Sequence, residues 1–466
     1  MRRRENPYLN YDQQMLGDIY TAGEAMDNLI TLCDDFGSRF GGTEGERQAV
    51  AFLREKFTGY GLSNAHLEPY TYNGWIRGEA CLEILEPIQR TIPCISLPYS
   101  PPAQIQGKLL YLREGGPDDF ARQHDQIRGK IVMVTSKNPP QLSRWVHRSE
   151  KYNRSVVAGA VGFIFMNHYP GLGPATGSIA GNREALIPGI SVSKEWGEFL
   201  VRLAERKGEV TLRITTTDKT EPMQSWNVVA ELPGQRYPDE LVIIGSHYDG
   251  HDISQGAEDP ASGMVVVLEA ARVLAKYARE ALDRTVRFIG FGNEEIGLIG
   301  AREYVKAHQD ELSRIRFMLN LDSAGGRKRK GIVLNQWPEL EPLLQEVAAE
   351  MVAEMPIGQQ TSAFSDHFPF FLEGVPTGMM GDAETPREGR GFGHTAFDTV
   401  DKVLLSNLRE AAANVCRVVL RIANHAAWPV KRRSPEQVRT LLESDANLEI
   451  MRLREAVEKL YQERGK

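Results

Sequence analysis

The hydrophobic positions between residues 11 and 61 recur three and four apart, which is the spacing of an amphipathic helix. The pattern runs through DQQMLGDIYTAGEAMDNLITLCDDFG and again through GERQAVAFLREKFTGYG, and Gly41 and Gly42 interrupt it. Because glycine favours loops over helix interiors, this break marks a boundary. The pattern therefore predicts two helices that pack on a larger body.

From about residue 79 to residue 215 the pattern changes to short apolar runs separated by glycine, proline and aspartate. The runs GKLLYL, KIVMVTS and VGFIFMNH have the length and composition that are typical of strands. We predict that residues 79–218 form a separate β-rich unit inserted into the chain.

After Trp226, apolar strands alternate with amphipathic helices. LVIIGSHYDG, RTVRFIGFGNEE and IRFMLNLDSAGG are typical of strands, whereas GMVVVLEAARVLAKYARE and GLIGAREYVKAH have helical spacing. This alternation indicates an α/β fold with a mixed, largely parallel sheet flanked by helices. We expect residues 1–78 and 219–430 to form this main domain.

Imidazole and carboxylate side chains follow three of the predicted strands. His247 and Asp249 follow LVIIGS, Glu294 and Glu295 follow VRFIGFGN, and Asp322 follows RFMLNL. Ligands of such sheets bind beyond the carboxyl ends of the strands, so we expect these side chains to meet at one edge. The adjacent glutamates repel each other, which suggests that a positive group lies beside them.

Divalent metals bind imidazole nitrogen and carboxylate oxygen atoms held in rigid positions, and a catalytic site leaves one position open for water. Such groups stand at the predicted strand ends and in adjoining loops: His247, Asp259, Glu295, Asp322 and His394. The set suits zinc, but five ligands are one more than a closed tetrahedral site accepts. If one carboxylate bridges, two metal ions can bind.

Length and charge narrow the possible functions. A chain of 466 residues is long enough for two domains. Its net charge of -7, from 55 basic and 62 acidic residues, argues against general binding to nucleic acid or to a membrane surface. The four cysteines form no C-x-x-C pair, so the sequence indicates neither a zinc finger nor a disulfide framework.

The basic start of the chain, MRRRENPYLNYDQQ, is not followed by the apolar stretch of a signal peptide. No run of about 18 apolar residues occurs that would suggest a membrane span. The expected location is therefore the cytoplasm, or outside the cell if a leader has been removed.

Five motifs, in this order, resemble those of the co-catalytic zinc peptidases of family M28: GSHYDGHDISQGAEDPASG, FGNEEIGLIGAREYV, NLDSAGG, SDHFPFFLEGVPTG and GHTAFDTVDKV. That family includes aminopeptidases and peptidases of the plasma glutamate carboxypeptidase type. The resemblance runs from about Thr31 to Asn424 and includes residues 79–218, which resemble a protease-associated (PA) domain.

The resemblance implies two zinc ions per chain, with cobalt or manganese as alternatives. It makes Asp259 the bridging ligand. His247 and Asp322 would complete one metal site, and Glu295 and His394 the other. In the same pattern Glu294 is the general base for the attacking water.

Two further roles concern the residues around these ligands. We expect the carboxylate of Asp249 to fix the imidazole of His247, and that of Asp398 to fix His394. The family usually has Asp or Asn after the bridging aspartate, often across a cis peptide, whereas this chain has Pro260. Because proline lowers the cost of the cis form, we predict a cis Asp259–Pro260 bond.

The resemblance implies a metallo-exopeptidase acting on short peptides, with an aminopeptidase slightly favoured over a carboxypeptidase. Candidate substrate contacts are His367 and Asp366, for which packing is an equal alternative, and Arg387 and Arg390. His251 is expected to be a loop residue and not a ligand.

Two alternatives stay open. An M20-like di-zinc amidohydrolase or dipeptidase shares this series of ligands but would lack a PA fold between residues 80 and 215. A non-catalytic binding protein on the peptidase fold would bind no metal.

The last segment, residues 431–466, is highly charged and is expected to form a C-terminal helical tail. Ile450, Leu453, Val457 and Leu460 lie on one helical stripe. The stripe predicts a helix docked on the body or, alternatively, one through which the chain forms a homo-oligomer.

Overall fold

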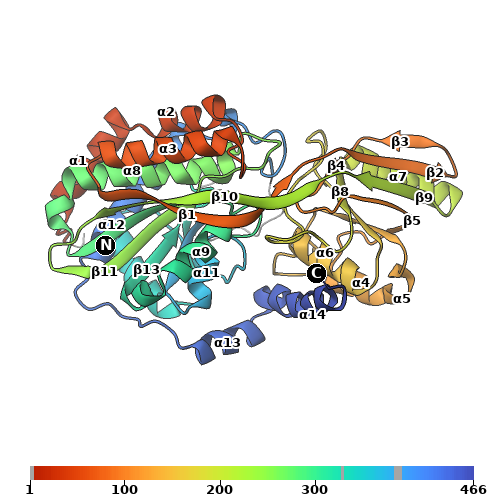
Figure 1. Ribbon diagram of the computed structural model, residues 1–466. Coiled ribbons are helices and arrows are strands. Elements are labelled where there is room, and N and C mark those ends of the chain that lie inside the picture. Colours follow the sequence, from red (N-terminus) through yellow and green to blue (C-terminus); the bar gives the residue numbers. More distant parts are fainter. Residues whose placement is uncertain (1–4, 327–329, 382–390, 466) are drawn as a thin grey trace.

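The computed structural model describes residues 5–326, 330–381 and 391–465, and all structural statements concern these residues. The chain forms two lobes (Figure 1). Two long antiparallel strands, β1 (Ser63–Ile76) and β10 (Lys219–Leu232), run from one lobe to the other. The chain therefore enters and leaves the smaller lobe through two adjacent strands, as expected for an inserted domain.

The larger lobe contains an eight-stranded sheet in the order β1-β10-β12-β11-β13-β16-β14-β15. Four central strands are parallel to one another: β12 (Arg284–Phe291), β11 (Tyr237–His247), β13 (Ile315–Asn320) and β16 (Thr377–Gly381). At one edge lie β14 (Gly331–Leu334) and β15 (Ile357–Gln359). The predicted α/β class with a mixed sheet is confirmed.

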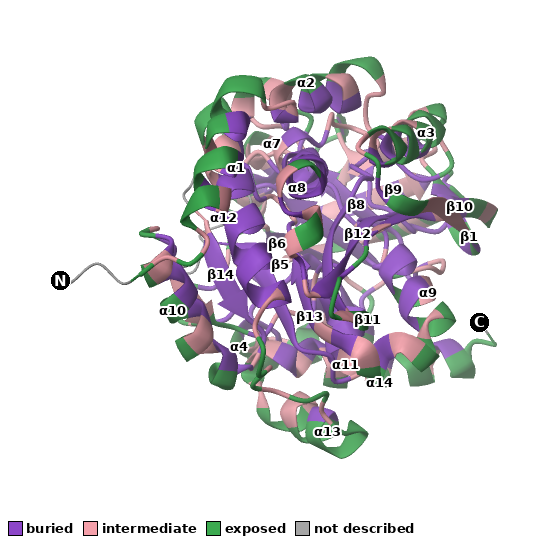
Figure 2. Cartoon of the chain, turned by 90° about the vertical axis from the view of Figure 1, so that its left-hand side faces the viewer, coloured by how far each residue is buried: buried purple, intermediate pink, exposed green. Residues whose placement is uncertain are grey.

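Helices cover both faces of this sheet. One face carries α1 (Leu9–Ala22), α2 (Ala25–Ile30), α3 (Glu44–Gly59), α8 (Ser262–Tyr277), α10 (Glu341–Glu350) and α12 (Leu405–Ala423). The other carries α9 (Ile299–Ala307) and α11 (His367–Leu372). Burial is concentrated in the strands and in the inner sides of the helices (Figure 2).

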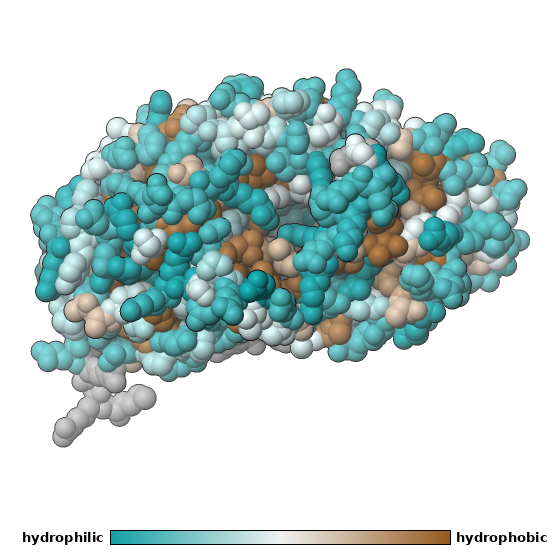
Figure 3. Space-filling model, turned by 60° about the horizontal axis from the view of Figure 1, so that its bottom comes forward, coloured by the Kyte–Doolittle hydropathy of each residue, from teal (hydrophilic) through white to brown (hydrophobic). Residues whose placement is uncertain are grey.

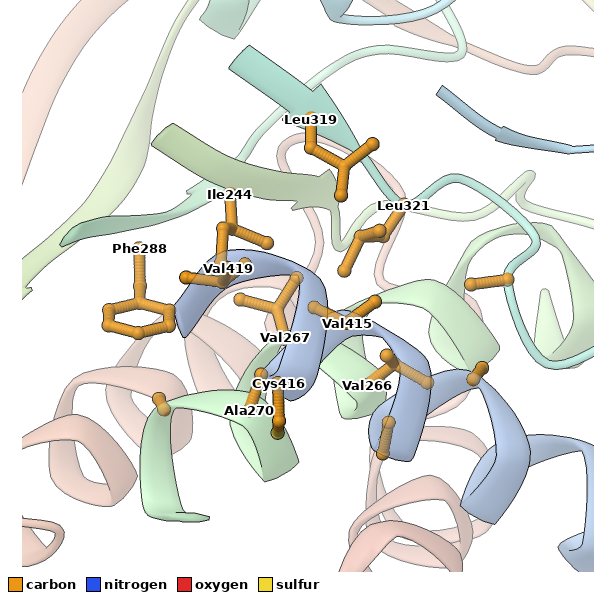
Figure 4. Close-up of a cluster of buried hydrophobic side chains, with 14 of the residues drawn as sticks. Ile244, Val266, Val267, Ala270, Phe288, Leu319, Leu321, Val415, Cys416 and Val419 are labelled. Carbon is orange, nitrogen blue, oxygen red and sulfur yellow. The ribbon is translucent and has the colours of Figure 1, made fainter. Parts of the chain in front are cut away.

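The helix α8 is apolar on almost every side because it lies between the sheet and other helices. Its Val267 packs beside Val419 of α12 and beneath Ile244 of β11 (Figure 4). Removing apolar surface of this kind from water stabilises the fold by about 25 cal/mol per Å². This packing fixes the carboxyl ends of the central strands relative to the start of α8.

The smaller lobe contains a second eight-stranded sheet in the order β3-β2-β9-β5-β6-β7-β8-β4. Its strands are β2 (Ala80–Glu86), β3 (Arg90–Ile92), β4 (Ile95–Ser96), β5 (Ala103–Tyr111), β6 (Ile131–Thr135), β7 (Gly162–Met166), β8 (Gly189–Val192) and β9 (Thr211–Thr216). Its helices are α4 (Pro117–Arg122), α5 (His124–Ile127), α6 (Arg148–Val157) and α7 (Lys194–Lys207). All of these elements fall within the predicted insertion, residues 79–218.

The C-terminal tail forms two helices, α13 (Pro435–Ser444) and α14 (Glu449–Glu463). Ile450 packs in a cluster with Leu298 and Phe368 of the larger lobe. Val457 and Tyr461 join the core of the smaller lobe. The tail therefore docks on its own chain and spans both lobes (Figure 1), while homo-oligomer formation through it stays a prediction.

The N-terminal segment differs from the prediction of a single helix. It forms α1, α2 and a short π-helical turn, Thr31–Asp35, because the backbone is extended at Gly23. None of the helices in the described part of the chain is both long and apolar enough to cross a membrane.

Candidate metal centre

The ends of the three central strands bring the predicted polar residues together. His247 is the last residue of β11, Glu294 and Glu295 follow β12, and Asp322 follows β13. Asp259 stands in the turn before α8. The expectation that these side chains meet at one edge of the sheet agrees with the structure.

The side chains form two groups that share Asp259. In the first group, Nε2 of His247 lies 3.5 Å from Oδ1 of Asp259 and 3.6 Å from Oδ1 of Asp322. In the second, Nε2 of His394 lies 3.4 Å from Oδ2 of Asp259 and 3.4 Å from Oε2 of Glu295. Ligand atoms about 2.0–2.1 Å from a tetrahedral ion are about 3.3 Å apart, so both groups have metal-ligand spacing.

The two carboxylate oxygens of Asp259 face different imidazoles, which is the arrangement of a bridging ligand. The segment around it has the predicted geometry, because the Asp259–Pro260 peptide bond is cis. Two sets of three residues have the spacing of potential metal ligands: His247, Asp259 and Asp322 form one, and His251, Glu295 and His394 form the other. His251 therefore lies within reach of the second site, next to Glu295 and His394.

The chemistry of the cluster also fits metal ions. Nε2 of His247 is buried and has no hydrogen-bond partner among the described residues. Burial raises the pKa of Glu295 to about 8 and raises the pKa of Glu294 well above its usual value. Neighbouring carboxylates are part of the cause of both raised pKa values, so a divalent cation would relieve the repulsion and occupy the open nitrogen.

Asp249 acts on the glutamates more directly than on the histidine. Its carboxylate accepts hydrogen bonds from the backbone N–H groups of Glu294, at 3.0 Å, and Glu295, at 3.2 Å. Its carboxylate oxygen lies 3.7 Å from Nδ1 of His247, whereas its backbone carbonyl oxygen lies at 3.0 Å. The carboxylate therefore lies within ion-pair distance of the imidazole, as expected, while the carbonyl oxygen is the closer partner of Nδ1.

Asp398 contacts the backbone of the turn before α8, while its expected contact with His394 stays a prediction. Its carboxylate accepts hydrogen bonds from the backbone N–H groups of Glu258, at 2.7 Å, and Asp259, at 3.1 Å. Asp398 thus holds the backbone of the bridging aspartate. The sequence placed it near the site, but its partner depends on how the turn before α8 is folded.

His251, expected to be a loop residue and not a ligand, lies beside the second group. Its side chain is buried, and Nε2 is 2.8 Å from Oε2 of Glu295 and 3.0 Å from Nδ1 of His394. The prediction that His251 lies in a loop is confirmed. A loop has no periodicity from which the direction of a side chain can be predicted, so the position of this imidazole beside the second site could not be predicted.

Two residues of the smaller lobe, Thr176 and Arg148, contact His394 of the metal centre. Nδ1 of His394 lies 3.2 Å from the carbonyl oxygen of Thr176 and 3.5 Å from Nη1 of Arg148. Arg148 is buried and donates to the same carbonyl at 3.0 Å. Sequence reasoning missed Arg148 because 246 residues separate it from His394 and no local pattern connects them.

Two cavities adjoin the centre. One, of about 350 Å³, is lined by Glu294, Glu295 and His394 together with residues of the smaller lobe and α14. The other, of about 130 Å³, is lined by Asp259, Glu294 and Asp322. The face that carries the tail helices is hollowed near its middle, between the lobes (Figure 3).

Two of the four predicted substrate contacts, Asp366 and His367, do not line these cavities. Both side chains are fully buried, and Nε2 of His367 lies 3.1 Å from the carbonyl oxygen of Ser362. This placement favours the packing alternative for both residues. Arg387 and Arg390 lie outside the described residues.

Comparisons with known proteins match both parts of the chain. The model of Peptidase family M28 matches residues 227–419, and that of the PA domain matches residues 105–200. Carboxypeptidase Q of Mus musculus is 27% identical over 335 residues, which are 68% of this chain and 70% of that protein.

Solved structures show the same two-lobed fold. A peptidase M28 precursor from Shewanella amazonensis has a TM-score of 0.76 at 22% identity and covers 91% of this chain and 98% of its own. A zinc aminopeptidase from Bacillus subtilis has a TM-score of 0.65 at 24% identity, covering 89% and 95%. Residues 227–419 thus match peptidase family M28 and residues 105–200 match the PA domain, so the chain is an M28-like metallopeptidase with a PA domain.

Proposed function

We propose that the chain is a di-zinc exopeptidase that hydrolyses terminal bonds of short peptides. The observation that carries this proposal is Asp259, whose two oxygens face the imidazoles of His247 and His394 at 3.5 and 3.4 Å. One carboxylate so placed can be shared by two ions, which a single-metal site would not need. His247 and Asp322 would hold one ion, and Glu295 and His394 the other.

Glu294 is the general base of this proposal. It lines both cavities, and its Oε2 lies 4.0 Å from Nε2 of His247. Bound metal ions would lower the pKa of a water molecule toward about 7 and stabilise negative charge on the substrate oxygen. Glu294 would accept the proton of the attacking water and pass it to the leaving amine, a role typically worth about 10²–10⁴-fold in rate.

Zinc is the proposed metal because two imidazoles and three carboxylates form the donor set, which suits zinc. The name of the Bacillus subtilis relative agrees with this choice. Cobalt or manganese would also suit these ligands.

The direction of cleavage is the finer part of the proposal. The relatives include a carboxypeptidase and an aminopeptidase, and an aminopeptidase stays slightly favoured. An M20-like amidohydrolase loses support because the model of the PA domain matches residues 105–200. The proposed ligands are short peptides, with no nucleic acid and no membrane, and a cytoplasmic location stays a prediction.

The proposal is tested by metal analysis and by hydrolysis of dipeptides blocked at either terminus. We expect about two zinc ions per chain and cleavage that only one of the two blocks prevents. Glu294→Gln should keep the metal but lower kcat by about 10²–10⁴-fold, because only the base is lost. Glu280→Gln, which alters an exposed glutamate, is the matched control.

Other outcomes would reject parts of this proposal. One zinc per chain in an active enzyme would remove the bridging role of Asp259. A folded protein that takes up no zinc and cleaves nothing would favour a non-catalytic binding protein. Full activity in Glu294→Gln would show that another group is the base.

A further inference from the structure

The larger cavity has a wall with two arginines that no carboxylate neutralises. Arg302 of α9 and Arg454 of α14 line the cavity that reaches Glu294 and Glu295. Nε of Arg302 donates to the carbonyl oxygen of Gly297 at 3.1 Å, and Nη1 of Arg454 lies 3.5 Å from the sulfur of Met451. Among the described residues, neither guanidinium forms an ion pair.

The other acidic groups on this wall already have partners. Glu458 pairs with Arg183 at 2.7 Å, and Glu303 pairs with Lys306 at 3.3 Å. Glu294 and Glu295 belong to the metal centre. The wall formed by Arg302 and Arg454 therefore keeps its positive charge.

The two arginines also affect each other. Burial, together with the charges of Arg302 and Arg183, lowers the pKa of Arg454 to about 10. Like charges that approach each other in a partly enclosed cavity are unfavourable, and an anion between them would remove this cost. Guanidinium groups bind carboxylates with paired, directional hydrogen bonds, so a carboxylate is the anion that suits them best.

We propose that Arg302 and Arg454 form a carboxylate-binding subsite that holds one end of the peptide substrate while its scissile bond lies at the metal centre. This inference deepens the proposed function and rests on it. The cavity volume of about 350 Å³ is within the range of about 300–1,000 Å³ typical of small-molecule sites. In a short peptide the carboxylate belongs either to the C-terminus or to an acidic side chain.

The tail gives this subsite its selectivity for length. Glu449, at the start of α14, pairs with Arg144 at 2.6 Å and with Arg154 at 2.7 Å, both in the smaller lobe. These ion pairs and the buried Val457 hold α14 across the cavity. Arg454, carried on this docked helix, would select peptides whose carboxylate lies a short distance from the scissile bond.

The test measures binding and hydrolysis separately. Calorimetry on zinc-loaded Glu294→Gln protein would compare Ala-Ala, Ala-Ala amide and Ala-Glu amide, which carry a terminal carboxylate, none, and a side-chain carboxylate. We expect at least one of the carboxylates to bind about 10- to 100-fold more tightly than the neutral amide, the range for hydrogen bonds between charged groups. Which of the two binds more tightly identifies the source of the carboxylate.

Arg454→Gln and Arg302→Gln should each abolish most of this preference and leave binding of the neutral amide unchanged. Lys459→Gln, which removes the same charge from an exposed position of α14, should keep the preference. If Arg454→Gln fails to fold, Arg302→Gln, on another element, still decides the question.

Equal binding of all three ligands, or an equal loss for all three in the arginine variants, would overturn the subsite. A carboxylate preference in a wild-type protein that hydrolyses none of the three would support the subsite and reject the proposed function.

Discussion

At the scale of single residues, Asp398 provides a test of how the bridging ligand is held. It lies outside both proposed ligand sets but accepts the backbone N–H groups of Glu258 and Asp259. Loss of such a supporting group typically costs about 10- to 100-fold in metal affinity. We therefore expect Asp398→Ala to bind zinc about 10- to 100-fold more weakly, as measured by competition with a chelator.

Asp401→Ala is the matched control, because Asp401 is an exposed aspartate three residues away that pairs with Lys402. It should bind zinc as the wild type does. Unchanged zinc affinity in a folded Asp398→Ala protein would mean that the turn before α8 keeps its shape without this carboxylate.

The same residues show what the sequence could predict at this scale. Residue types at strand ends, such as His247 and Asp322, could be placed at the site because the strand pattern fixes where each strand ends. The backbone N–H partners of Asp249 and Asp398 could not be predicted, because they depend on the fold of loops that have no periodicity. His251 was missed for the same reason, whereas Arg148 was missed because 246 residues separate it from His394.

At the scale of elements, α14 is the helix whose docking matters most for the cavity. Ile450 is fully buried between the tail and the larger lobe. Truncating a buried isoleucine to alanine typically costs about 2–5 kcal/mol. We expect Ile450→Ala to weaken docking of the tail, so that a protease cleaves residues 435–463 faster while the rest of the chain is cleaved as before.

Glu455→Ala, an exposed change on the same helix, should leave the cleavage rate unchanged. If Ile450→Ala increased cleavage equally throughout the chain, the tail would be part of one cooperative unit. The helical stripe was visible in the sequence, but the surface on which it docks was not, because both lobes contribute to that surface.

At the scale of the whole molecule, the two-lobed arrangement was predicted from changes in pattern along the chain. The contacts between the lobes were not, because His394 and Thr176 meet only in the folded state, 218 positions apart. Long-range ion pairs in the larger lobe are hidden from sequence in the same way. One of them, between the N-terminal helix α1 and α8, gives a prediction for the stability of the whole fold.

Asp18 of α1 accepts hydrogen bonds from Arg272 at 2.5 Å, Lys276 at 2.6 Å and Tyr277 at 2.7 Å. Burial alone would raise its pKa, but Lys276, Tyr277 and Arg272 lower it from 3.8 to about 2. A lowered pKa adds stability that is present above about pH 4 and is lost as the pH falls toward about 2. At about 1.4 kcal/mol per pKa unit, this contribution is about 2 kcal/mol.

Asp18→Asn should therefore unfold more easily than the wild type at pH 7, by about 2 kcal/mol in denaturant titrations, and the difference should shrink between pH 4 and pH 2. Both proteins are compared with metal removed by a chelator, because loss of metal at low pH would otherwise add its own effect. Asp310→Asn, at an exposed position, should match the wild type throughout. A difference that is the same at pH 7 and pH 2.5 would show that Asp18 stabilises the fold by packing and not through its charge.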